Sequence, residues 1–123
     1  MSSQTTVQST LSAILTYASK QPELRFMSNE IMMSRIYIQN IFKQNQEKFI
    51  EDMYKTIIPY EKQIDDQDYN FFFYLANEHS TKQSNATLKK IARQLSENSD
   101  KIPDATKEKF MLMFKKLLDQ LRD

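Results

Sequence analysis

Residues 28–58 read SNEIMMSRIYIQNIFKQNQEKFIEDMYKTII, a stretch without glycine or proline. Its large apolar residues recur at steps of seven or four, which is the spacing of one face of an α-helix. This face consists of Ile31, Ile38, Phe42, Phe49, Met53 and Ile57. The stretch therefore predicts a helix of about 30 residues, roughly 45 Å long, that begins near Ser28. The polar segment 43–48 leaves room for a kink but does not require one.

The same stretch carries apolar residues that lie outside this face. They are Met32, Met33, Ile36, Ile50 and Tyr54. One core cannot cover residues that point in different directions around a helix, so we expect these five to bind a partner protein. Methionine suits this role because its side chain adapts to varied surfaces. The alternative is that these residues fill the core.

Prolines at 22, 59 and 103 divide the rest of the chain. Before Pro22, apolar residues at helical spacing predict a helix from Thr5 or Thr6 to about Lys20. Its buried face is expected to consist of Val7, Leu11, Ile14, Leu15 and Ala18. After Pro59 the same spacing recurs in three shorter stretches. These three helices are expected at residues 69–78, 86–96 and 105–121.

The predicted fold class is therefore all-α, with five helices. Residues 1–58 should form an N-terminal helical hairpin that contains the one long helix. Residues 60–123 should form a tri-helical unit like that of helix-turn-helix proteins; the alternative is that both parts pack as one domain. The aromatic run 71–74 is expected to be helical, because no second strand exists to pair with it.

Composition argues against most kinds of catalytic site. The 123 residues include no glycine, no cysteine and one histidine, His79, so phosphate-binding loops, nucleophile elbows and the usual zinc sites are absent. Asp66, Asp68 and Asn70 resemble the start of a calcium loop, but Phe71 stands where that loop needs glycine. We expect the acids to cap a helix and His79 to be solvated at a helix C-terminus. The prediction is a protein without enzyme activity, metal, cofactor or small-molecule substrate.

Charge is unevenly distributed, although the formal net charge is only +1. Residues 59–79 carry five acids and one lysine, whereas residues 80–116 carry nine lysine or arginine residues and four acids. Such a block suits contact with phosphates; the alternative is the solvated face that every amphipathic helix has. The cations expected to contact DNA are Lys89, Lys90, Arg93, Lys107, Lys109, Lys115 and Lys116. On the last helix, Lys109 and Lys116 should face outward, since Lys116 lies about 200° from Phe114.

The last 60 residues resemble tri-helical domains of the Myb and homeobox-like families. Residues 87–95, TLKKIARQL, are similar to the second helix of Myb repeats, and residues 110–116, FMLMFKK, are similar in outline to a homeobox recognition helix. The chain departs from these families in its lack of tryptophan, its longer connector at 97–104, and Lys116 at the place of the base-reading asparagine. The resemblance implies DNA contact, mainly through the backbone. Homeobox-like subunits also occur in the ciliate DNA adenine methyltransferase complex, so it implies an accessory subunit of such a complex.

The expected location follows from what the chain lacks. No basic start precedes an apolar stretch, and the longest apolar run covers only residues 71–76. We therefore expect no membrane contact and an intracellular location, nuclear in a eukaryote.

The composition also bears on the source of the gene. Glutamine and residues with AT-rich codons are abundant, which favours a ciliate gene, with an AT-rich phage or bacterium as the alternative.

Two functions from different classes remain open. The first is an accessory subunit that contacts DNA and binds protein partners of a larger nuclear complex. The second is a helical protein–protein adaptor, or a viral assembly protein, without nucleic-acid contact.

Overall fold

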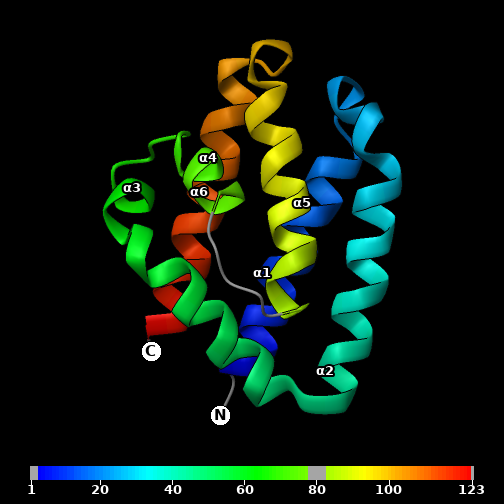
Figure 1. Ribbon diagram of the computed structural model, residues 1–123, viewed down its shortest axis with the longest axis vertical. Coiled ribbons are helices and arrows are strands. Elements are labelled where there is room, and N and C mark those ends of the chain that lie inside the picture. Colours follow the sequence, from blue (N-terminus) through cyan, green and yellow to red (C-terminus); the bar gives the residue numbers. More distant parts are fainter. Residues whose placement is uncertain (1–2, 78–82, 123) are drawn as a thin grey trace.

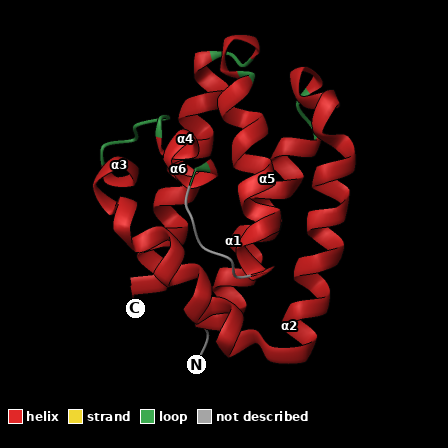
Figure 2. Cartoon of the chain, viewed as in Figure 1, coloured by secondary structure: helices red, strands yellow, loops and turns green. Residues whose placement is uncertain are grey.

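The computed structural model describes residues 3–77 and 83–122, with side chains described at 7–77 and 89–122. Every regular element in these residues is helical, which confirms the all-α prediction (Figure 2). The α-helices are α1 (Ser3–Ser19), α2 (Ser28–Ile57), α3 (Glu61–Asp65), α4 (Phe71–Ala76), α5 (Gln83–Glu97) and α6 (Asp104–Arg122). Short 3₁₀ helices join them: η1 (Pro22–Met27), η2 (Ile58–Tyr60) and η3 (Ser99–Lys101). His79, which the sequence predicts to be solvated, lies outside the described residues.

The first helix and the turn after it follow the apolar pattern of the sequence. All five apolar positions of the α1 stripe are buried: Val7, Leu11, Ile14, Leu15 and Ala18. α1 ends at Ser19, close to the predicted end at Lys20. Pro22 then opens η1, where its fixed φ is preorganised for a helical turn, and this turn buries Leu24 and Met27.

α2 is the predicted long helix, with 30 residues, but it changes direction at Asn45. The backbone of Asn45 is non-helical, with φ −161° and ψ 76°. Its side-chain Oδ1 accepts a hydrogen bond from the backbone N–H of Lys48 at 3.2 Å, which caps the second half of the helix. The rings of Phe42 and Phe49 meet across the bend, with centroids 5.2 Å apart. The helix is therefore not one straight rod of about 45 Å, and its second half runs toward α3 (Figure 1).

The aromatic run forms the short helix α4, as expected. Phe71, Phe72 and Leu75 are buried, with at most 1% of each side chain exposed, whereas Phe73 is 55% exposed. A strand would bury alternate residues, and here two neighbours share one side. The chain enters α4 through Gln67, whose φ of 56° is left-handed, a conformation that a chain without glycine has to give to another residue.

Each α-helix of the described chain contributes to one hydrophobic core. α1 packs against α2 and α6, α5 packs against α4 and α2, and α3 packs against α6. The Thr10 hydroxyl donates to Oε1 of Gln120 at 2.7 Å, and the Tyr17 ring meets Phe110 edge-on at 5.3 Å, so α1 and α6 run antiparallel. Residues 1–58 and 60–123 therefore build the same core.

Candidate functional site

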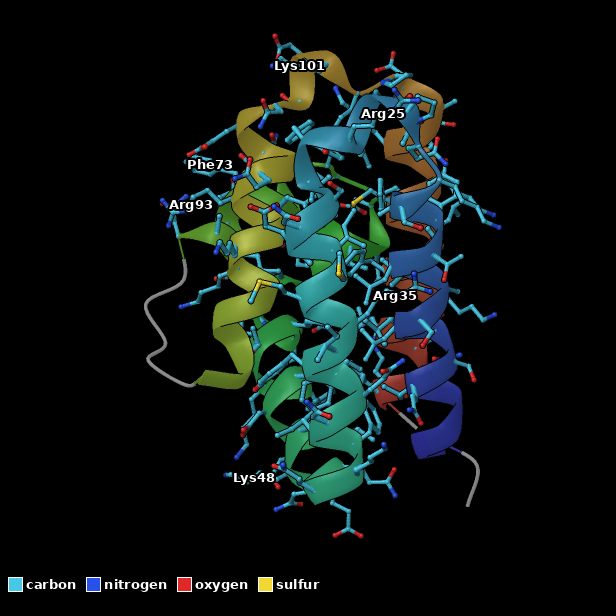
Figure 3. The ribbon with its side chains drawn as sticks, turned by 90° about the vertical axis from the view of Figure 1, so that its right-hand side faces the viewer. Arg25, Arg35, Lys48, Phe73, Arg93 and Lys101 are labelled. Carbon is cyan, nitrogen blue, oxygen red and sulfur yellow. The ribbon has the colours of Figure 1, made fainter. Side chains whose placement is uncertain are left out.

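The first half of α2 presents an exposed apolar surface, which we call the α2 patch. It consists of Met32, Met33 and Ile36, whose side chains are 56%, 66% and 51% exposed. On the opposite side of the same turns, Ile31 and Ser34 are 2% and 1% exposed and face the core. Figure 3 shows this half of α2 at the front of the molecule, between α5 and α1. The patch is therefore surplus to the core that the helix builds.

The other two residues predicted to bind a partner lie elsewhere. Ile50 and Tyr54 are in the second half of α2, beyond the bend at Asn45, and both are half-buried. Ile50 packs against the core cluster. The structure thus brings together three of the five predicted residues. The periodicity left room for a bend in the polar segment 43–48 but did not require one. The local signal of its position is Asn45, a residue type that commonly caps the start of a helix.

Polar and charged residues border the α2 patch on both sides. On the α1 side, Nη2 of Arg35 donates to Oγ1 of Thr16 at 3.0 Å (Figure 3). On the α5 side, a groove of about 310 Å³ lies between the patch and Lys90 of α5. It is lined by Asn29, Glu30, Met33, Ser34 and Lys90. An apolar centre with a polar border is the usual anatomy of a protein-binding surface.

The seven cations expected to contact DNA do not share one face. Lys89, Lys90 and Arg93 lie on α5, and the other four lie on α6. Lys90 lines the groove beside α2, whereas Arg93 lines a smaller groove of about 120 Å³ beside α4. There Nη2 of Arg93 donates to the carbonyl oxygen of Ala76 at 3.4 Å, and Figure 3 shows Arg93 near Phe73.

The four lysines of α6 have different surroundings. Nζ of Lys107 lies 5.3 Å from the ring centroid of Tyr69, a cation–π contact. Lys115 is half-buried. Lys109 and Lys116 are exposed, as the angle from Phe114 predicted. These two lysines line a third groove, of about 420 Å³, between α6 and α1.

The residues considered for metal binding have a structural role where they are described. Oδ1 of Asp68 accepts a hydrogen bond from the backbone N–H of Asn70 at 3.0 Å, which forms a turn just before α4 begins. The prediction that these acids cap a helix is wrong for α4, whose N-terminus has no side-chain cap, because Asp68 bonds within the turn. No group of three or more histidine, cysteine or acidic side chains within the described residues is placed to hold a metal ion.

The space inside the molecule is small. A cavity of about 50 Å³ lies between α1, α2, α5 and α6, with apolar walls apart from Ser34 and Tyr37. Pockets for small organic ligands have volumes of about 300–1,000 Å³. The cavity is therefore a packing void, and the surface grooves are the candidate sites.

Comparisons with known proteins add no relative. No protein-family model, no curated protein and no solved structure matches the chain. None of the helices in the described part of the chain combines the length and the apolar character that crossing a bilayer requires.

Proposed function

We propose that this chain is a non-catalytic helical adaptor that docks onto a partner protein through the α2 patch. The observation that carries this proposal is the exposure of Met32, Met33 and Ile36, each more than half accessible to solvent on one helix face. Burying such surface contributes about 25 cal/mol per Å². The patch therefore offers binding free energy that the fold of the monomer does not use.

The placement of the patch supports docking in two further ways. Its residues lie on a regular helix whose opposite side is fixed by the core at Ile31 and Ser34, so binding requires little reordering of the backbone. Methionine also fits partners of varied shape, since its unbranched side chain adopts many conformations.

The experiment compares the proteins that co-purify with tagged full-length chain from the cells that express it. The test variant is Met33→Glu/Ile36→Glu, which places two charges in the α2 patch. The matched control is Phe73→Glu, which changes an equally exposed apolar residue on α4. We expect a protein that is lost with the test variant and retained with the control, while circular dichroism shows that both remain folded.

The opposite result would be equally clear. If every co-purifying protein is retained by the folded Met33→Glu/Ile36→Glu variant, the α2 patch is not a docking surface. If the control loses the same proteins, the loss does not report on the α2 patch.

Contact with DNA is the competing function, and the accessory subunit of a DNA adenine methyltransferase is its most specific form. The arrangement of the cations favours the adaptor, because Lys90, Arg93 and the lysine pair of α6 line three separate grooves. Phosphate binding that depends on several cations acting together needs them on one face. The adaptor therefore should not retard a DNA duplex at about 150 mM salt, and retardation there would favour the accessory subunit.

A further inference from the structure

The groove between α1 and α6 combines cations with an apolar floor. It is lined by Ser9, Thr10 and Ala13 of α1 and by Lys109, Leu112, Met113, Lys116 and Gln120 of α6. It shares no lining residue with the α2 patch. Its volume of about 420 Å³ is the largest of the grooves described above.

The charge of this groove has one sign. Lys109 and Lys116 are its charged lining residues, and within the described part of the chain neither forms an ion pair. Asp119, on the next turn of α6, is instead held by Arg122 at 3.4 Å. The two lysines are seven residues apart, about 10 Å along the helix. The groove therefore attracts a ligand with two negative charges at that spacing.

The floor between the lysines is apolar. Leu112 is 50% exposed, and Met113 and Ala13 lie beside it in the lining. Leu112 and Met113 are three and four residues after Lys109, so the order along the groove is cation, apolar, cation. A complementary helix has an acid, an apolar residue three or four positions later, and a second acid seven positions from the first.

We propose that this groove binds an acidic amphipathic helix of a partner protein. Its two carboxylates pair with Lys109 and Lys116, and its apolar side chain packs on Leu112. This is a second docking site, independent of the α2 patch.

Duplex DNA fits the same groove less well. A major groove about 12 Å wide admits one α-helix, which is itself 10–12 Å thick. Here α1 lies along α6 and is held to it by the bond from Thr10 to Gln120, so the two lysines belong to a surface two helices wide. A phosphate backbone would also leave Leu112 without an apolar partner.

The test selects peptides from a phage-displayed library of 16-residue sequences on the immobilised full-length chain. We expect enriched peptides with two acids seven residues apart and an apolar residue between them. Fluorescence anisotropy then measures the best peptide against the wild type and Lys109→Glu/Lys116→Glu. Affinity should fall about tenfold, since two exposed ion pairs are lost and replaced by repulsion. Lys20→Glu/Lys62→Glu, with the same change of net charge at exposed sites, should bind like the wild type.

A charge exchange makes the test specific. A peptide with lysine in place of both acids should bind the Lys109→Glu/Lys116→Glu variant better than the wild type. The proposal is overturned if the enriched peptides lack the acids, if none is enriched, or if binding ignores the two lysines. It is also overturned if a DNA duplex binds in a manner that depends on these lysines, or if the chain forms a dimer that they control.

Discussion

The side chain of Asn45 joins the two halves of α2 by accepting a hydrogen bond from the Lys48 amide. Loss of such an N-cap costs about 1 kcal/mol. We therefore expect Asn45→Ala to lower the free energy of unfolding by about that amount in a urea titration, whereas Asn45→Asp, which keeps an acceptor, should leave it nearly unchanged. An Asn45→Ala variant as stable as the wild type would show that the bend does not depend on this cap.

Tyr69 should make stability sensitive to alkaline pH. Its hydroxyl donates to the carbonyl oxygen of Leu95 at 3.0 Å, and burial raises its pKa above the ordinary value of 10.0. Above that pH the unfolded chain loses the phenol proton while the folded chain keeps it. The unfolded state then binds fewer protons, so the free energy of unfolding falls as pH rises.

The measurement compares urea unfolding of the wild type and Tyr69→Phe between about pH 8 and 11. At about pH 8 the free energy of unfolding of the variant should be about 1 kcal/mol lower than that of the wild type, because the Leu95 carbonyl loses its donor. As pH rises the difference should shrink. A difference that stays constant with pH would contradict the prediction.

At the scale of one element, α4 divides its aromatic residues between the core and solvent. The Phe72 ring lies 5.2 Å from that of Phe114 and 5.0 Å from that of Tyr69, and 1% of the side chain is exposed. Phe72→Ala should therefore lower the free energy of unfolding by about 3–5 kcal/mol. Phe73→Ala, one residue away on the exposed side, should change it by less than about 0.5 kcal/mol. Similar losses for both variants in urea titrations would mean that α4 is not oriented as described.

At the scale of the whole molecule, one hydrophobic core spans both halves of the chain. α5 packs against α2, and α6 packs against α1. A fragment of residues 60–123 keeps the packing of α4 on α5 but loses α2 and α1, so part of the apolar surface of α5 and α6 is left in water. We expect this fragment to show no cooperative thermal transition by circular dichroism, whereas the full chain shows a single one. A fragment that unfolds cooperatively would establish an independent tri-helical unit.

Local patterns predicted which residues are buried better than they predicted which helices meet. The spacing of Val7, Leu11 and Ile14 predicted the buried face of α1, and the angle from Phe114 predicted that Lys116 is exposed. Neither pattern shows that α1 covers α6, because a pairing between distant segments has no local signature. For that reason the lysine pair was predicted as an open face, whereas it lines one wall of a groove. The polar segment 43–48 left room for a kink, but the pattern could not place it at Asn45, since one capping bond decides it within a helical pattern.

The antiparallel pairing of the first and last helices also determines how late in translation the core can be completed. Thr10 and Gln120 are separated by 110 positions. At a synthesis rate of roughly 5–20 residues per second, α6 leaves the ribosome roughly 5–20 s after α1. Throughout this interval α1 can pack on α2, but it lacks α6, the other helix that covers its apolar face. Part of the apolar face of α1 therefore stays in water until α6 is made, and we expect closure of this long loop to be a late step in folding.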